Sequence, residues 1–178
     1  MQALVRSSRV LAALCPLLTL VACATGSSRP DIVQPLSAGA IATPHLSDVS
    51  IDAKPGLSVS QGARDRIVDL VKTEIAAQSP DALATAGAAG SPPAMKLQIV
   101  LTEYDEGNAF ARAMLAGLGQ IKISADVDYL DAATGTRLGE YRVSKDFAFG
   151  GIYGATTKIE DVEKGFAKSV AETLKANK

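Results

Sequence analysis

The sequence predicts an α+β domain of two layers, in which two amphipathic helices cover one face of an antiparallel sheet. Three stretches alternate apolar and polar residues, and two others repeat apolar residues every three or four positions. These stretches, with one short apolar segment before them, follow the order β-α-β-β-β-α. The chain has 178 residues, 47% of them hydrophobic and 21% charged, which is enough for one core and too few for two ordinary domains.

The first strand and helix of the domain lie between residues 49 and 77. Residues 49–51 (Val-Ser-Ile) predict a short strand, which a Pro-Gly pair ends. Ser58 and Gln61 have the spacing of a capping box, so a helix is expected to begin there and to run to about Ala77. Its apolar residues fall on one face: Ala63, Ile67, Leu70, Val71 and Ile75.

The sheet is expected to continue with three longer strands. Residues 95–105 and 121–130 alternate apolar and polar side chains, and residues 138–147 return as the next strand. The segment 131–135 (Asp-Ala-Ala-Thr-Gly) between the last two favours a turn, since Asp bonds the backbone ahead and Gly takes positive φ. One apolar and one polar face predict a sheet that is covered on one side.

The last element is a second amphipathic helix. Thr157 and Glu160 have capping-box spacing just before it. Apolar residues then recur every three or four positions to the end of the chain: Ile159, Val162, Phe166, Val170 and Leu174. Phe166 lies in the middle of this face, so we expect it to be buried against the sheet.

The N-terminus has the pattern of a secretory signal. Arg6 and Arg9 precede residues 10–22, which are thirteen residues without a charge. This stretch is shorter than the ~20 apolar residues that a membrane-spanning helix needs, and Pro16 interrupts it. We therefore predict that residues 1–22 are a signal peptide.

The end of this segment, Leu-Val-Ala-Cys at residues 20–23, resembles the cleavage site of bacterial lipoproteins. The resemblance implies cleavage before Cys23, acylation of Cys23 and anchoring of the mature chain in a membrane. Because Cys15 leaves with the signal, Cys23 would be the single Cys of the mature chain, and acylation protects it from oxidation. Ala24 follows the Cys, and by resemblance to the sorting of enterobacterial lipoproteins a residue other than Asp there implies the outer membrane, with the domain in the periplasm. The alternative is a plain secretory signal with an incidental Cys.

Residues 23–45 are rich in Gly, Ser and Pro and are expected to form a flexible linker, which leaves 46–178 as the single α+β domain. His45, the sole His, lies at the end of this linker. It is expected to be a solvated residue rather than a ligand or a general base, because no second ligand type stands near it.

Composition limits the functions that this domain can have. A net charge of -1 does not favour nucleic-acid binding, and four Tyr, four Phe and no Trp make a stacking platform improbable. One His and two Cys leave little for nucleophilic or metal chemistry. We therefore expect no enzyme activity, no metal and no cofactor.

Two groups of side chains are candidates for a catalytic or a metal site. Lys122 and Ser124 could form a catalytic pair, but their spacing is what strand alternation produces. Asp126 and Asp128 share a strand face, with Asp131 just beyond, and carboxylates of this kind bind Ca²⁺. The dense ligand spacing of a calcium loop is missing, so a solvated sheet face is the preferred interpretation.

The segment 107–119 (GNAFARAMLAGLG) is too long for a simple hairpin between its neighbouring strands. Phe110, Met114 and Leu115 can share one side of a short helix within it. One interpretation is a loop that folds over an open edge of the core. The other is a contact element that docks on a partner or on a neighbouring copy of the chain.

Residues 118–135 (LGQIKISADVDYLDAATG) resemble the central block of a family of bacterial lipoproteins classed as a domain of unknown function. The resemblance implies a cell-envelope compartment and this fold type. We thus expect a lipid-anchored protein whose non-enzymatic domain binds or assembles with an envelope component, a protein partner or another copy of itself. The alternative is a periplasmic enzyme or small-ligand binding module with a pocket between sheet and helices. A buried polar constellation would favour the alternative, and an exposed apolar patch would favour assembly.

Overall fold

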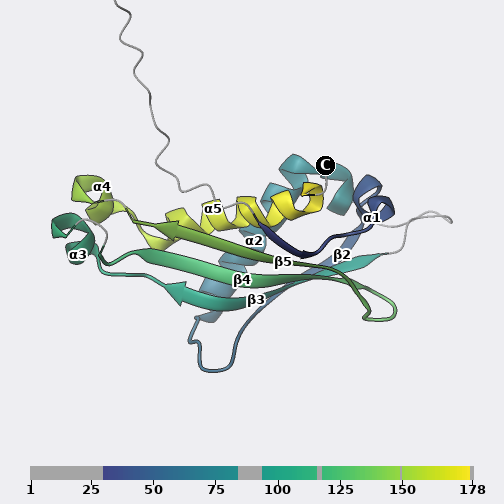
Figure 1. Cartoon of the computed structure of the whole chain (residues 1–178), viewed down its shortest axis with the longest axis horizontal. Coiled ribbons are helices and arrows are strands. Elements are labelled where there is room, and N and C mark those ends of the chain that lie inside the picture. The colour runs from purple at the N-terminus through teal and green to yellow at the C-terminus, as the bar shows by residue number, and fades with distance from the viewer. Residues whose placement is uncertain (1–29, 84–93, 116–117, 149, 177–178) are drawn as a thin grey trace, which may run out of the picture.

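The computed structural model describes residues 30–83, 94–115, 118–148 and 150–176, which form a two-layer α+β domain (Figure 1). Five strands make one sheet in the spatial order β1-β5-β4-β3-β2. The strands are β1 (Asp31–Gln34), β2 (Leu46–Ala53), β3 (Met95–Asp105), β4 (Ile121–Asp131) and β5 (Arg137–Phe147). The helices are α1 (Ala38–Ala42), α2 (Gln61–Gln78), α3 (Ala109–Met114), α4 (Gly151–Thr156) and α5 (Ile159–Glu172). Residues 1–22 and Cys23 lie outside the described residues, so the predicted signal and lipidation site stay predictions.

The three long strands form where alternation predicts them. β3, β4 and β5 pair antiparallel, with Leu97 opposite Tyr129 and Val127 opposite Tyr141. These four side chains are fully buried, because the apolar set of each strand points to the same face. The rings of the two tyrosines meet edge to face with their centroids 5.9 Å apart, which adds to the packing.

One pair of strands differs from the expected antiparallel arrangement. β2 pairs with β3 in parallel, with Val49 opposite Leu97. The reason is the connection, since α2 carries the chain from the end of β2 back to the start of β3, as in a βαβ unit. The sheet is otherwise antiparallel, as predicted.

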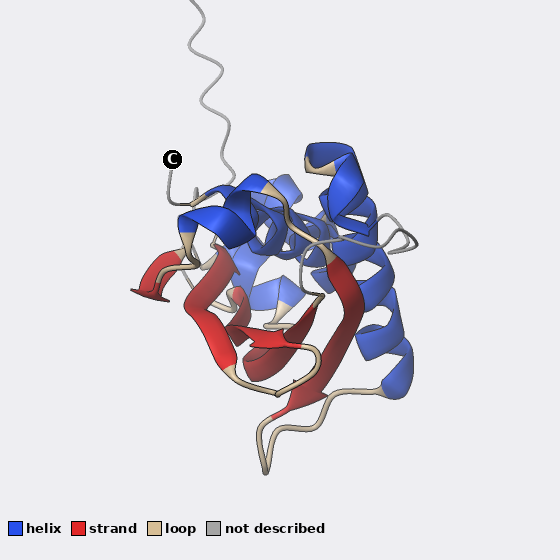
Figure 2. Cartoon of the chain, turned by 90° about the vertical axis from the view of Figure 1, so that its right-hand side faces the viewer, coloured by secondary structure: helices blue, strands red, loops and turns tan. Residues whose placement is uncertain are grey.

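The two long helices lie on the same face of the sheet and contact each other (Figure 2). Phe166 of α5 is fully buried, which confirms its predicted position in the core. Both helices begin later than the expected capping boxes. The Ser60 hydroxyl accepts a hydrogen bond from the Ala63 amide at the start of α2, and the Asp161 carboxylate accepts one from the Lys158 amide at the start of α5.

Residues 30–45, which the composition predicted as linker, contain strand β1 and helix α1. Leu36 is buried against Gly139, and a Cβ atom at position 139 would clash with the Leu36 side chain. The Leu36 amide donates a hydrogen bond to the Tyr141 hydroxyl at 3.0 Å. His45 is only 8% exposed, and its carbonyl accepts a hydrogen bond from the Met95 amide. The expectation of a solvated His45 is therefore wrong, because this segment leads directly into β2.

Among the residues that the structure describes, no helix has the length and apolar character needed to cross a membrane.

Candidate functional site

Two short helices, α3 and α4, project together from one end of the sheet (Figure 1). This is the end where β3 and β5 finish and β4 begins, because Asp105 pairs with Lys122 and Ile121 pairs with Phe147. Six large apolar side chains are exposed on and beside these helices: Phe110 73%, Met114 68%, Leu115 53%, Leu118 57%, Ile152 82% and Tyr153 80%. We call these six residues the apolar tip.

The exposure of the tip decides between the two interpretations of segment 107–119. A loop that covered the core would bury its apolar side chains, whereas Phe110, Met114 and Leu115 are all more than half exposed. The core-cover interpretation is therefore wrong. The short helix itself is present as α3, and contact of these residues with a partner stays a prediction.

A single buried arginine holds the tip together. Arg112 of α3 is 3% exposed, and its guanidinium donates four hydrogen bonds to backbone carbonyls. The acceptors lie on both sides of α3 and in α4 and its C-cap: Glu106 at 3.1 Å, Gly119 at 2.7 Å, Gly154 at 2.9 Å and Thr157 at 3.1 Å. Because the planar guanidinium presents its donors in a fixed fork, one side chain fixes both helices relative to each other.

The two ends of the α3 segment are also closed by glycines. Gly107 has φ +63°, and a Cβ atom there would collide with the carbonyl of Gly119. The amide of Asn108 donates to that same carbonyl, while the Asn108 side chain caps α3 by accepting from the Ala111 amide. The two ends of the α3 segment are therefore held close together.

Sequence reasoning found half of the tip and missed the other half. Phe110, Met114 and Leu115 were expected to act together, and the structure adds a second group of large apolar residues: Leu118, Ile152 and Tyr153. A usable signal was present, since GNAFARAMLAGLG follows β3 and GGIYG follows β5. Both β3 and β5 are antiparallel to β4, so these two glycine-bounded apolar segments must meet at one end of the sheet.

A buried polar constellation also exists, between α2, α5 and β3. The carboxylate of Glu163 is fully buried, accepts from Arg66 at 2.6 and 2.8 Å and accepts from the Tyr104 hydroxyl at 2.8 Å. The hydrogen bonds with Glu163 raise the pKa of Arg66, and burial raises the pKa of Tyr104 above its usual value. Both carboxylate oxygens accept hydrogen bonds, so the constellation ties three elements together, with the Arg66 side chain 40% exposed at its outer side.

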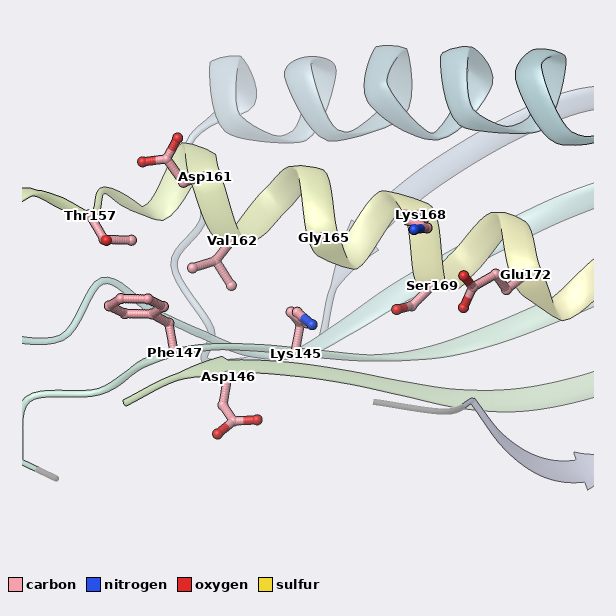
Figure 3. Close-up of a pocket in the computed structure, with 10 residues that line it drawn as sticks. All are labelled: Lys145, Asp146, Phe147, Thr157, Asp161, Val162, Gly165, Lys168, Ser169 and Glu172. Carbon is pink, nitrogen blue, oxygen red and sulfur yellow. The ribbon is translucent and has the colours of Figure 1, made fainter. Parts of the chain in front are cut away.

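A groove of about 450 Å³ runs between β5 and α5 (Figure 3). Its charged residues have both signs: Lys145, Lys168, Asp146, Asp161 and Glu172. Lys145 points from β5 toward Gly165 of α5, where a Cβ atom would lie 2.9 Å from its Cε. The lysine stem thus packs across the groove, and the lining shows no uniform charge that would select an ionic ligand.

The open face of the sheet holds the carboxylates that were weighed as calcium ligands. Asp126 lies 3.4 Å from Arg142, and Asp128 lies 3.1 Å from Arg137. Asp131 accepts hydrogen bonds within its own turn. In the described ranges, no group of three or more His, Cys, Asp or Glu is placed to hold a metal ion.

The Ser124 hydroxyl, weighed as half of a catalytic pair with Lys122, donates to the carboxylate of Glu103 at 3.4 Å and accepts from the hydroxyl of Ser144 at 3.1 Å. These contacts link neighbouring strands across the open face of the sheet. They resemble ordinary cross-strand pairs of a polar face.

Comparison with protein families gives one match. The model of a domain of unknown function, DUF4410, matches residues 50–151, which is more than half of the chain. The chain belongs to the DUF4410 family. The matched part of this DUF4410 protein includes β3, α3, β4 and β5, and it ends just before Ile152. No curated protein matches the chain at a significant level.

Solved structures are similar to this DUF4410 protein in fold. A single-substitution variant of PelC from Paraburkholderia phytofirmans, described as a dodecamer, has a TM-score of 0.52 at 13% identity and covers 84% of this chain and 98% of its own. PelC itself, also described as a dodecamer, gives 0.54 at 12% identity, with 82% and 96% covered. A protein of Caulobacter crescentus described as a candidate lipoprotein gives 0.40 at 22% identity, with 78% and 93% covered. At these identities the likeness to the two PelC structures shows the fold alone.

Proposed function

We propose that this DUF4410 protein is a lipid-anchored lipoprotein of the cell envelope, facing the periplasm from the outer membrane, whose domain contacts another envelope component without catalysing a reaction. The observation that carries the proposal is the apolar tip. Six large apolar side chains are exposed at one end of the domain, which is costly in water unless a partner covers them. Arg112, with the close contact between Gly107 and Gly119, holds them in a fixed arrangement, as a contact surface requires.

The anchor is tested by Cys23→Ser in cells. Without the thiol no acyl chain can be attached, so the variant is expected to leave the membrane fraction or to keep its signal. Mass spectrometry of the parent should show the added acyl chains on Cys23. A variant that stays in the membrane fraction with unchanged electrophoretic mobility would contradict the proposed lipid anchor.

The contact is tested by replacing Phe110, Met114 and Leu115 together with Ser. These side chains are exposed in the isolated domain, so its thermal stability should change little. Contacts in intact cells, measured by crosslinking from the tip, should be lost. Lys158→Ser with Glu160→Ser, which removes one exposed charge of each sign beside the tip, is the matched control. A large loss of stability in the triple variant would argue against a contact surface.

Self-association is a second candidate, and the edge strand β1 favours it. All four residues of β1 are exposed, including Ile32 and Val33 at 47% each, on an open edge of the sheet. An exposed apolar edge strand is a template for pairing with another chain, and the PelC structures are described as dodecamers. Sedimentation of the parent should then show oligomers, which Ile32→Lys with Val33→Lys should disrupt. A monomeric parent at high concentration would rule this candidate out.

A small-ligand binding module, which is the alternative from the sequence, would use the groove between β5 and α5. Lys145 and Gly165 meet across this groove, so a bound ligand would have to displace the lysine stem. Lys145→Ala would then strengthen the binding of an uncharged ligand. The mixed charge of the lining gives this alternative less support than the tip gives to assembly.

A further inference from the structure

Exposed large apolar side chains are concentrated at one end of the domain. Among the described residues, eight large apolar side chains are exposed; six of them form the apolar tip, and the other two, Ile32 and Val33, lie in β1. The opposite end of β4 and β5 is the polar turn at residues 131–136, where Asp131 bonds the backbone. The domain is therefore apolar at one end and polar at the other.

The chain enters the domain from the side of the tip. β1 is antiparallel to β5, with Asp31 opposite Arg142 and Gln34 opposite Glu140. Since β5 runs toward the tip and ends at Phe147, the N-terminal end of β1 points toward the tip as well. The N-terminal end of β1, where the predicted anchor segment joins the domain, therefore faces the same end of the sheet as the apolar tip.

The chain between Cys23 and Asp31 is long enough, when extended, to reach from the start of β1 to the level of the apolar tip. Cys23 is eight residues before Asp31, so it can lie at most about 26–29 Å away. The five steps along β5 from Arg142 to Phe147 take up about 17 Å. About 10 Å then remain beyond the end of the sheet, which is roughly the thickness of one helix. An acylated Cys23 can therefore lie level with the outer side of α3 and α4.

We propose that the apolar tip docks on the bilayer that holds the Cys23 acyl chains, so that the domain stands on the membrane by this end. The inference rests on the proposed lipid anchor and names the envelope component that the tip contacts. Phe, Leu, Met and Ile side chains favour the boundary between headgroups and acyl chains, and Tyr153 suits the same level because its ring is amphipathic.

The electrostatics of the tip define the kind of lipid surface. None of its six side chains is charged, and the guanidinium of Arg112 is buried on four carbonyls. Lys158 and Glu160 beside it have opposite charges. Docking therefore depends on burial of apolar surface, and uncharged phosphatidylcholine vesicles should be sufficient, with little dependence on salt.

The main experiment uses the full mature protein, purified with its acyl chains and placed in phosphatidylcholine vesicles. Acylation blocks Cys23 and Cys15 is removed with the signal, so Tyr153→Cys provides the single free thiol for a fluorescent label. Ala133→Cys, exposed in the turn at the other end of the domain, is the matched control. Vesicles with a nitroxide quencher on the lipid chains should quench the label at position 153 by at least half and leave the label at position 133 nearly unchanged.

Other patterns of quenching overturn the proposal. Equal quenching at both positions would mean that the domain has no preferred end at the membrane, and no quenching at either would mean that the tip is in water. A label at position 153 that is shielded from soluble and lipid quenchers alike, with crosslinks to another polypeptide, would assign the tip to a protein partner.

A second measurement does not depend on the anchor. In a Cys23→Ser protein from which the signal, residues 1–22, has been removed, partition onto the same vesicles should fall at least about tenfold when Phe110, Ile152 and Tyr153 are replaced by Ser. The control pair Lys158→Ser and Glu160→Ser should leave the partition unchanged. If mass spectrometry finds no acyl chains on the parent, the proposed anchor fails, and this partition alone decides the docking. Equal partition of the tip variant and its parent would overturn the docking even in an acylated protein.

Discussion

Replacing Arg112 should loosen the tip without unfolding the domain. Its guanidinium makes four hydrogen bonds to backbone carbonyls, and a hydrogen bond to a charged group contributes about 1.5–3 kcal/mol. Burial of the cation costs several kcal/mol in the opposite direction, and water can reach the freed carbonyls because the tip lies at the surface. For Arg112→Met, which keeps most of the stem volume, we expect a net loss of about 2–4 kcal/mol.

Hydrogen exchange of the α3 and α4 amides measures this loss, because Arg112 bonds carbonyls in both segments and its removal should make local opening of the helices easier. A loss of 2–4 kcal/mol corresponds to exchange that is about thirtyfold to several hundredfold faster. Arg112→Lys keeps the charge but lacks the planar fork, so it should lie between Met and the parent. Arg137→Met, which removes an exposed arginine at the polar end, is the control. If the Met variant exchanged like the parent in both helices, Arg112 would not be holding them together.

Three further predictions concern the core, the buried ion pair and the hairpin turn. Phe166→Ala should lower the free energy of unfolding by about 3–5 kcal/mol, since the ring is fully buried; a loss under about 1 kcal/mol in urea denaturation would contradict that packing. Glu163→Gln should cost about 1–3 kcal/mol, because the buried carboxyl loses its charge-assisted bonds to Arg66, and a double-mutant cycle with Arg66→Gln should show coupling between the two. Hydrogen bonds from the amide and the hydroxyl of Thr134, and one from the amide of Ala133, lower the pKa of Asp131 in the folded state. The ionised Asp131 therefore stabilises the fold above the unfolded pKa of about 3.9, and this stabilisation is lost as pH falls through the folded pKa. In Asp131→Ala the free energy of unfolding should thus fall less steeply with acid, and an unchanged acid dependence would contradict this.

Local pattern was sufficient for most of the fold. The alternation in 95–105 and 121–130 predicted the two central strands, because a sheet that is buried on one face accepts only one register of apolar residues. Helical periodicity placed Phe166 in the core for the same reason. The parallel pairing of β2 with β3 was missed, although the intervening helix already required it.

The site was less accessible to sequence reasoning. Phe110, Met114 and Leu115 were recognised as one group, but an apolar segment has the same composition whether it covers a core or projects from it. Arg112 is the single charged residue of segment 107–119, and its neighbours in the sequence give no sign of what it binds. Its role depends on carbonyls as far apart in the sequence as those of Glu106 and Thr157, and only the folded chain brings them within reach of one guanidinium.

By itself the sequence determined the α+β class, the helix faces, the turn at 131–135 and the N-terminal signal pattern, because each depends on residues within a few positions of one another. Tertiary structure alone decided that β1 joins the sheet, since this four-residue strand has no buried face and is held by hydrogen bonds to β5, over a hundred residues away. It also decided that α3 and α4 meet and stay exposed, because their contact is made by the buried Arg112 across two connections that the sheet places at one end. Such long-range contacts carry no local signature, and they give this domain its apolar tip.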